Sequence, residues 1–518
     1  MRVLILTPYG LYRRWPTTPD TTKMVTNGAP VTMAQLAAAL PGHEVRIFDG
    51  NVYRPPLAEF VSLLRWADVL AMNVMSSYAA LNTELNVRFM RRVAPGRPIV
   101  LGGHHATFCA EEWLARGVDV VVRREGEVTL AELIEAYAAG RDISDIAGIS
   151  LLREGRVRHN PDRAFVASLD SLPLPRWDLV DWSGYNLFLR RRGKAACLET
   201  GRGCLHACQF CQVSPMWKRT HRWKSPARVL QELRDLHGRG VRQLFVVDDD
   251  YGDQADAARQ HALYDAWQAS GLDFEWGTFL RPDYVLRNPD LIARGARLGL
   301  CYAWLGFETV SPGWLRAYAK GFSEPGDPLA HYREVYRILR DNGVMVNGFL
   351  VVGYPGQTVA DMQESLDAFR AYCDYPVVTF YKPLKGTAGY RLCEEQGLLA
   401  KDTFYHDSQA TTVKGSEGLL PVYNRFFLKL LADPANLWRC LASPRRLERD
   451  MLRAVYSWFG GSVVRNFSWD GFADWVALKT NRGETPQGLI DRLTRKYLDD
   501  SYVGSLARRF GPGQPPER

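Results

Sequence analysis

The chain is 518 residues long, which exceeds one ordinary hydrophobic core and predicts two or three domains. Hydrophobic residues at 46%, charged residues at 24% and a net charge of +8 are typical of a globular protein, and no run of about 18 apolar residues could cross a bilayer. Nine unevenly spaced cysteines and an N-terminus without a signal-peptide pattern argue against a secreted disulfide scaffold and predict a cytoplasmic protein with reduced thiols.

The first third alternates short apolar runs with helical patterns. Helical patterns such as 32–40 and 79–93 separate the apolar runs. Continuous apolar strands that alternate with helices are typical of a parallel sheet covered on both faces. We therefore predict a doubly wound, Rossmann-like α/β domain over residues 1–147. Its predicted strands are 2–8, 44–49, 68–74, 98–104 and 118–127.

The carboxyl ends of these strands form the edge at which such sheets bind ligands. Glycines and small hydroxyl residues follow the ends here, and they let the backbone approach a bulky ligand closely. No GxGxxG follows the first strand, so the ordinary dinucleotide fingerprint is missing. A tight turn is an equally good interpretation of the Gly102-Gly103 pair alone.

Residues 148–190 have the composition of a junction. The stretch 149–159 has the pattern of a β-hairpin, and 169–182 is a proline-punctuated connector. A second domain is therefore expected to begin just after it.

The middle of the chain, 191–400, repeats strand-like runs at intervals filled by helical patterns. Ser225 followed by Pro226 is a helix start of the expected kind. Six such units are too few to close an eight-stranded barrel, so we predict a partial (βα)6 barrel of the TIM type whose chemistry lies at the carboxyl ends of its strands. The predicted strands are 196–200, 242–250, 273–282, 301–308, 344–353 and 376–383.

A short loop after the first of these strands, TGRGCLHACQFCQV, carries Cys204, Cys208 and Cys211. Three thiolates this close together indicate a shared metal centre. A structural zinc usually takes four closed ligands, and His206 lacks the spacing of a zinc knuckle, although Cys197 could complete a set. A four-iron cluster held by only three cysteines would leave one iron free to bind another ligand.

The CxxxCxxC loop with an aromatic residue before its last cysteine resembles the radical S-adenosylmethionine (SAM) superfamily. The resemblance implies a [4Fe-4S] cluster on Cys204, Cys208 and Cys211, with SAM on the open iron. The stretches VVDDDYG, GFETVSPGWLRAYAKG and VNGFLVVGYPGQT also resemble that superfamily's strands. Arg281 could instead form a structural salt bridge. The SAM-binding residues implied are Phe210, Asp248, Asp249, Arg281, Glu308 and Gly353.

A doubly wound domain with GGHH before such a barrel resembles the cobalamin-binding members of the superfamily. Ser76 precedes Gly102 by the spacing found in cobalamin folds, but no Asp-x-His-x-x-Gly occurs in the first 150 residues, so no histidine ligand to cobalt is expected. The cobalamin contacts implied are Tyr9, Asn73, Met75, Ser76, Ser77, Tyr78, Gly102, Gly103, His104, His105, Glu125, Gly126 and Glu127.

Over residues 1–400 the chain most resembles the branch with hopanoid methylases and anaerobic porphyrin cyclases. This implies a C-methyltransferase that methylates an unactivated carbon of a lipid or secondary metabolite through a 5′-deoxyadenosyl radical and methylcobalamin. It also implies an external electron donor such as flavodoxin or ferredoxin. Cyclisation without methyl transfer is the alternative within the family, and a non-catalytic cobalamin-binding sensor is the alternative outside it.

The substrate pocket and the C-terminal region carry weaker signals. Tyr302, Trp304 and Tyr381 could line an apolar substrate pocket or simply belong to the core. Residues 401–518 predict a mainly helical domain, and 421–518 carry 16 Lys and Arg against 10 Asp and Glu. That segment could cap the barrel or make a peripheral membrane contact. No nucleic-acid partner is expected, because the front domain lacks the cysteines of tRNA methylthiotransferases.

Overall fold

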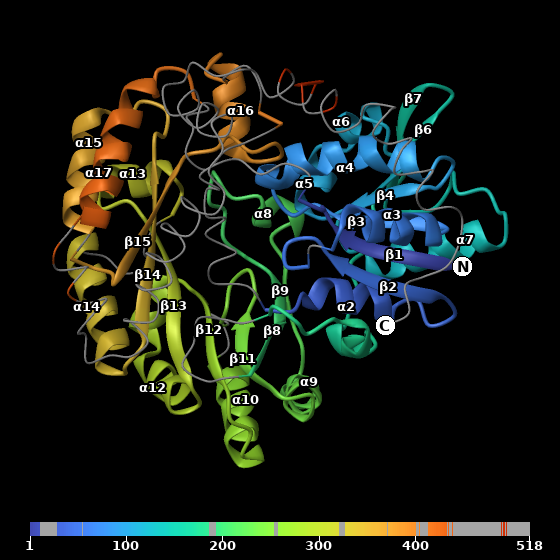
Figure 1. The fold of residues 1–518 in the computed structure, drawn as a ribbon. Coiled ribbons are helices and arrows are strands. Elements are labelled where there is room, and N and C mark those ends of the chain that lie inside the picture. Colours follow the sequence, from blue (N-terminus) through green and yellow to red (C-terminus); the bar gives the residue numbers. More distant parts are fainter. Residues whose placement is uncertain are drawn as a thin grey trace.

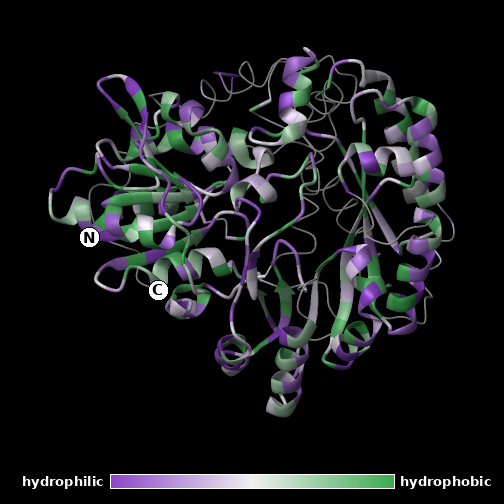
Figure 2. Ribbon diagram, turned by 180° about the vertical axis from the view of Figure 1, so that it is seen from behind, coloured by the Kyte–Doolittle hydropathy of each residue, from purple (hydrophilic) through white to green (hydrophobic). Residues whose placement is uncertain are grey.

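The computed structural model places a mixed sheet and a parallel sheet beside each other, each covered by helices (Figure 1). Hydrophobic residues gather along the strands and on the helix faces turned toward them (Figure 2). The structure describes residues 1–10, 28–53, 55–185, 193–252, 257–320, 327–369, 371–399, 403–404 and 413–432, with single positions 434, 438, 488, 491, 492 and 494.

The front sheet has the strand order β2-β1-β3-β4-β5-β6-β7. Its first five strands are parallel and confirm the predicted doubly wound domain. The predicted hairpin forms and pairs antiparallel with β5, so this sheet continues past residue 147. The strands are β1 (Arg2–Thr7), β2 (Glu44–Asp49), β3 (Val69–Asn73), β4 (Ile99–Gly102), β5 (Val120–Val122), β6 (Ile149–Arg153) and β7 (Arg156–His159).

Helices cover both faces of the front sheet because alternate strand residues point to opposite sides. Val3 and Ile5 of β1 pack against α2 (Val31–Ala38) and α7 (Glu127–Ala138). Leu4 and Leu6 face the other helices, which are α3 (Leu57–Trp66), α4 (Ala80–Val93), α5 (His104–Phe108) and α6 (Ala110–Ala115).

The second sheet has the order β15-β14-β13-β12-β11-β8 and is entirely parallel, as predicted for a partial barrel. Its edge strands β8 and β15 do not pair with each other, so the barrel is open. The strands are β8 (Lys194–Leu198), β11 (Val241–Val246), β12 (Glu275–Leu280), β13 (Leu300–Glu308), β14 (Met345–Val352) and β15 (Tyr375–Phe380).

Helices follow the barrel strands and pack on their outer face. Ser225 caps α9 by accepting from the amide of Arg228, with Pro226 at the first helical position, as predicted. The helices are α9 (Pro226–Gly238), α10 (Ala257–Ser270), α11 (Pro282–Arg287), α12 (Pro289–Arg297), α13 (Pro312–Ala317), α14 (Pro328–Asp341), α15 (Val359–Phe369) and α16 (Ala388–Glu395).

A segment of the front domain lies along the free edge of β8. The Ala29 amide donates to the carbonyl of Ala195 (2.9 Å), and the Cys197 amide donates to the carbonyl of Ala29 (3.0 Å). Gly28 approaches so closely that a Cβ there would lie 2.7 Å from the backbone carbon of Ala196. One strand edge of the barrel is therefore covered by the front domain.

The described start of the C-terminal region packs on the barrel. Helix α17 (Leu420–Ala432) buries Tyr423 and Phe426 in the barrel core, and the Tyr423 hydroxyl donates to the carbonyl of Val378 (3.2 Å). The rest of the predicted helical domain and most of the basic segment 421–518 lie outside the described residues. Within the described part, no helix has the length and apolarity needed to cross a membrane.

Candidate functional site

The three clustered cysteines lie between β9 (Gly201–Gly203) and α8 (Val213–Met216), directly after the first barrel strand. Cys204, Cys208 and Cys211 are partly exposed and carry free thiols. Burial raises the pKa of Cys211 to about 12, and it raises the pKa of Cys204 as well. Because both thiols stay neutral unless a cation stabilises their thiolates, this donor set favours a metal centre.

Asp250 and His206 lie beside the first of these cysteines. The Cys204 thiol donates to Oδ2 of Asp250 (3.6 Å), which also lies 3.4 Å from Nε2 of His206. Oδ1 of Asp250 is buried without a hydrogen-bond partner among the described residues. Donor atoms of Cys204, His206 and Asp250 lie within 4.8 Å of one another, a set that excludes the other two cysteines.

Asp248 and Asp249, two predicted SAM contacts, support the backbone that leads into the cysteine loop. Asp248 accepts from the amide of Thr200 (2.6 Å) and from its hydroxyl, and Asp249 accepts from the amide of Gly203 (3.1 Å). Burial raises the pKa of Asp248 to about 7 and that of Asp249 to about 6. The carboxylates therefore hold the first barrel strand in place, and a direct SAM contact stays a prediction.

Three further predicted SAM contacts lie at the carboxyl ends of barrel strands. Arg281 donates to Asp283 (3.0 Å), the structural salt bridge that the sequence left open. Glu308 pairs with Lys320 and has φ +68°, a conformation that costs free energy in a residue other than glycine. Gly353 has φ +81°, where glycine is unstrained. A strained acidic residue at a strand end is typical of a functional site.

The predicted substrate residues fall into two groups. Tyr302 and Trp304 point to the inner face of the barrel, among Phe245, Met345 and Val377. The Tyr302 hydroxyl, the Trp304 indole N–H and both amide atoms of Asn347 are buried there without hydrogen-bond partners in the described chain. The structure thus brings Tyr302 and Trp304 together and adds Asn347, which the sequence analysis missed.

Tyr381 packs in a separate cluster from Tyr302 and Trp304, so a pocket shared by all three residues stays a prediction. The cluster of Tyr381 also contains Tyr318, Tyr354 and Phe210, the residue before the last clustered cysteine. The rings of Phe210 and Tyr318 meet edge to face with centroids 5.8 Å apart. Tyr381 therefore lies close to the cysteine loop.

The front sheet presents tightly turned loops at its carboxyl edge. Gly103 has φ +102°, and a Cβ there would lie 2.5 Å from Oδ1 of Asn73 and 2.7 Å from the carbonyl of Val74. Met75 in the loop after β3 is 49% exposed, whereas Ser77 is buried. The side chain of Tyr78 lies outside the described part, and Tyr9 stacks on Phe60 with ring centroids 4.7 Å apart.

The two histidines at this edge have different surroundings. Nε2 of His104 is buried without a described hydrogen-bond partner, and its ring meets Trp217 of the barrel domain edge to face. His105 accepts from the Trp113 indole (3.1 Å) and donates to the carbonyl of Phe404 (3.0 Å). Both ring nitrogens of His105 are used by the protein, which argues against its predicted cobalamin contact and favours a structural role.

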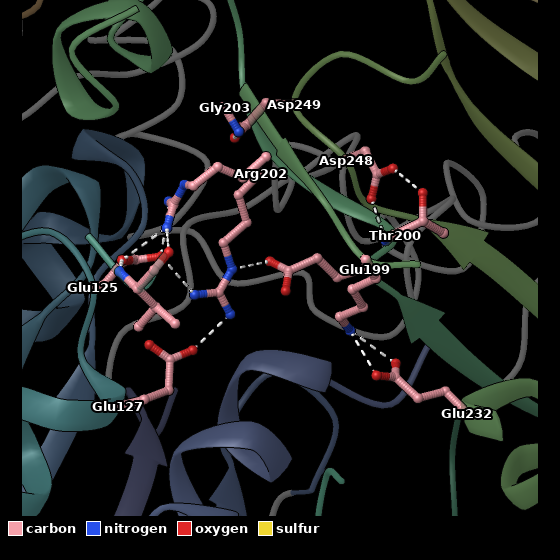
Figure 3. Close-up of polar contacts among 12 residues, drawn as sticks. Glu125, Glu127, Glu199, Thr200, Arg202, Gly203, Glu232, Asp248 and Asp249 are labelled. Atoms are coloured by element: carbon pink, nitrogen blue, oxygen red, sulfur yellow. Dashed lines mark hydrogen bonds and ion pairs between the residues drawn. The ribbon is translucent and has the colours of Figure 1, made fainter. Parts of the chain in front are cut away.

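Glu125 and Glu127, also predicted to contact cobalamin, bind arginines of the barrel domain instead (Figure 3). Arg202 donates to Glu125 (3.0 Å) and to Glu127 (2.6 Å). Gly126 between them packs against Leu36, since a Cβ there would lie 2.9 Å from that side chain. Their carboxylates are therefore occupied by protein partners, and a cobalamin contact through them is not supported.

Two family models match the chain, and they match its two sheet domains. The B12 binding domain matches residues 19–134, and the radical SAM superfamily matches residues 198–369. The chain combines a B12-binding domain with a radical SAM domain. The match to the second model includes the cysteine loop and four complete barrel strands, β11 to β14.

Three curated relatives share 26–29% identity with this chain. An uncharacterized methyltransferase from Pyrococcus horikoshii is 27% identical over 77% of this chain and 84% of the relative. The hopanoid C-3 methylase of Methylococcus capsulatus is 29% identical over 75% and 73%. An anaerobic magnesium-protoporphyrin IX monomethyl ester cyclase from Synechocystis is 26% identical over 72% and 73%.

The fold of the chain also matches a solved structure. The cobalamin-dependent SAM radical enzyme OxsB, with aqua-cobalamin bound, superposes with a TM-score of 0.66 at 15% identity, over 98% of this chain and 77% of that one. At this identity the likeness concerns the fold alone.

The residues present fit the cofactors that the two domains imply, a [4Fe-4S] cluster, SAM and cobalamin. Cys204, Cys208 and Cys211 would hold the cluster. At the front sheet's edge, a Cβ on Gly10 would meet nothing within 4 Å, and one on Gly102 would meet only the carbonyl of Val122 at 3.7 Å. This open backbone and the unpaired nitrogen of His104 are suited to a bulky polar cofactor.

Sequence reasoning missed the residues that join the two halves of this site. Arg202 lies in a glycine-rich stretch, and Arg222 lies on β10 (His221–Trp223), which pairs with β9. The sequence signal that could have identified Arg202 is an arginine at a strand position two residues before Cys204. The front-domain partners of Arg202 are more than 70 residues away in the sequence, so no local pattern could identify them.

Proposed function

We propose that the protein is a cobalamin-dependent radical SAM methyltransferase that methylates an unactivated carbon of a lipid or secondary metabolite. The observation that carries the proposal is the contact between the cysteine loop's flanks and the carboxyl edge of the B12-binding domain. Methyl transfer from cobalamin to a carbon activated by the radical SAM centre requires both cofactors to face one substrate.

The cofactors supply hydrogen abstraction and the methyl group, and the chain supplies the surroundings. The inner face of the barrel has an aromatic surface suited to an apolar substrate. This surface is formed by Phe245, Phe279, Tyr302, Trp304 and Phe349. The unpaired amide of Asn347 and the Trp304 N–H could orient a polar group of that substrate. The relatives named as methyltransferases and as a methylase support the same reaction class.

The test is anaerobic reconstitution of the full chain with iron, sulfide and hydroxocobalamin, followed by product analysis with methyl-labelled SAM and a strong reductant. We expect 5′-deoxyadenosine, one bound cobalamin, and label in a product from a lipid or terpenoid extract. Cys208→Ala should lose the cluster and all SAM cleavage, whereas Cys373→Ala, a buried cysteine outside the loop, should retain both.

Two other outcomes would replace this proposal. A ring-closed product that has lost hydrogen relative to the substrate and carries no methyl label would favour the cyclase alternative. The likeness to the Synechocystis cyclase supports that alternative. Cobalamin binding without any SAM cleavage in the intact chain would favour the sensor. An external electron donor such as flavodoxin or ferredoxin is proposed as the natural reductant.

A further inference from the structure

The loop after the last parallel strand of the front sheet reaches across to the barrel domain. Arg124, at the end of β5, has φ +64°, in the left-handed region that is unfavourable for arginine. Its guanidinium donates to the carbonyls of Pro215 (3.0 Å) and Met216. These carbonyls lie at the C-terminal end of α8, the helix that begins two residues after Cys211. The strained loop thus holds one flank of the cysteine loop.

The next residues of the same loop hold the other flank. Glu125 accepts from Arg202 (3.0 Å) and from Arg222 (2.9 Å), and Glu127 accepts from Arg202 (2.6 Å). Arg202 lies on β9, and Arg222 is its direct partner on β10. Both strands that lead into and back from the cysteine loop are therefore bound by front-domain carboxylates. Figure 3 shows the contacts of Arg202 with Glu125 and Glu127.

We call this set of contacts the interdomain clamp. It consists of the hydrogen bonds from Arg124 to the carbonyls of α8 and of the ion pairs of Glu125 and Glu127 with Arg202 and Arg222. The side chains of Arg202, Glu125 and Glu127 are only 7%, 6% and 8% exposed. Buried ion pairs contribute little net stability, because desolvation offsets most of their attraction. Removing one partner is nevertheless costly, since it leaves a charge buried and unpaired. Such an arrangement specifies a geometry more than it stabilises a fold.

Arg202 is also bound by a carboxylate of the barrel domain itself. Glu199 accepts from Nε of Arg202 (2.9 Å), so the planar guanidinium is fixed by three carboxylates in three directions. The adjoining Thr200 and Gly203 are held by Asp248 and Asp249. The segment directly before Cys204 is therefore fixed from the barrel on one side and from the front domain on the other.

We propose that the interdomain clamp sets the position of the cluster relative to cobalamin, with Arg202 and Glu125 as positioning residues. This inference rests on the proposed function only in requiring that both cofactors bind, because neither a substrate nor methyl transfer is needed for the clamp to act. Loss of the clamp leaves each cofactor in its own domain but removes the fixed separation between them.

A control variant lies in the same domain. Arg228 pairs with Glu232 at 2.8 Å, with side chains 9% and 1% exposed, and the contacts described for Arg228 lie within the barrel domain and the linker. Arg228→Gln leaves Glu232 paired with Lys224 (2.8 Å), whereas Arg202→Gln removes a guanidinium shared by three carboxylates. Arg228→Gln therefore controls for the loss of a buried arginine and is expected to cost less stability. Only Arg202→Gln removes a contact between the domains.

The experiment measures the spin relaxation of bound cob(II)alamin beside the reduced cluster in the full reconstituted chain. This relaxation depends on the separation of the two paramagnetic centres and requires no turnover. We expect enhanced relaxation in the wild-type protein and in Arg228→Gln, and at least a twofold weaker enhancement in Arg202→Gln with unchanged iron and cobalamin content.

Unchanged relaxation in Arg202→Gln, with both cofactors bound, would overturn the proposal, as would the absence of enhancement in the wild-type protein. If Arg202→Gln fails to fold, Glu127→Gln provides the same measurement, because it weakens the clamp while Arg202 keeps Glu125 and Glu199. A normal relaxation pattern without any methylated product would contradict the proposed function and leave the clamp standing.

Discussion

The two sheets use their carboxyl edges in opposite ways. At the front sheet's edge the backbone itself is prominent, with the left-handed turn at Gly103, the open Gly102 and the exposed Met75. At the barrel's edge carboxylates are prominent, because Asp248 and Asp249 bind backbone amides and Glu308 binds Lys320. A bulky cofactor needs an accessible backbone, whereas a short metal-binding loop needs rigid anchors.

The difference extends to protonation. Burial lowers the pKa of the front-domain residues His104 and His105 to about 4, whereas burial raises the pKa of Asp248 in the barrel to about 7. Both shifts favour neutral groups inside the protein. They have opposite consequences for stability, since the front domain is weakened by acid and the barrel by base. Two domains that are both built around a β-sheet thus differ in their response to pH.

The largest expected effect comes from the left-handed turn at Gly103 in the front sheet. Gly103→Ala should destabilise the front domain by about 5 kcal/mol and abolish cobalamin binding, because the new Cβ would overlap Asn73 and Val74 at a positive φ. Gly102→Ala, where a Cβ has room, is the control. Peptide-level hydrogen exchange checks each domain separately, and equal protection in the two variants would contradict the prediction.

The barrel should gain stability at alkaline pH when Asp248 is replaced. Between pH 4 and its raised pKa of about 7, folded Asp248 retains a proton that the unfolded chain releases, so stability falls as pH rises through this window. Asp248→Asn keeps the contacts to Thr200 and should stabilise the barrel by up to roughly 4 kcal/mol at pH 8. Hydrogen exchange at pH 5 and pH 8 measures the difference in barrel stability between Asp248→Asn and the wild-type protein. The same difference at both pH values would refute the prediction.

The front domain should show the reverse dependence. Folded His105 titrates near pH 4 and the unfolded residue near 6.5, so stability is complete above pH 6.5 and declines as pH falls toward 4. His105→Gln should remove up to roughly 3 kcal/mol of this acid sensitivity while its amide replaces the contacts to Trp113 and Phe404. The measurement is the hydrogen-exchange protection of front-domain peptides between pH 4.5 and pH 7, with barrel peptides as an internal reference.

The smallest effect is expected inside the barrel. Asn347→Leu should raise the barrel's unfolding free energy by about 1 kcal/mol, because it removes two buried, unpaired polar atoms without changing the volume much. Asn86→Leu in the front domain should lower stability instead, since that amide bonds the backbone of Tyr9. Chemical denaturation of both variants tests the contrast, and a loss in Asn347→Leu would reveal a hidden partner.

The sheets, the partial barrel and the cysteine loop could be predicted because their signals are local. Apolar runs such as 2–8 and 242–250 identify strands, and the spacing of Cys204, Cys208 and Cys211 identifies the metal centre. The capping of α9 by Ser225 is equally local. These features depend on residues within a few positions of one another, which is the range over which periodicity and motifs carry information.

The partners of charged side chains could not be predicted in the same way. Glu125 and Glu127 follow a strand end, and nothing near them in the sequence indicates that Arg202 occupies their carboxylates. The family resemblance implies a cobalamin contact for His105, which follows a glycine pair, whereas in the structure Trp113 and Phe404 bind both of its ring nitrogens. Ion pairs and buried histidines are decided by tertiary packing, which brings distant segments together.

The pairing of Ala29 with the free edge of β8 determines how the protein can be divided. A truncated chain that begins after the front domain would expose the carbonyl of Ala195 and the amide of Cys197 on the edge of β8. Such edges recruit strands from other molecules and lead to aggregation. The radical SAM domain is therefore expected to precipitate when it is expressed alone. In the intact chain, residues 28–30 of the front domain cover this strand edge and prevent self-association.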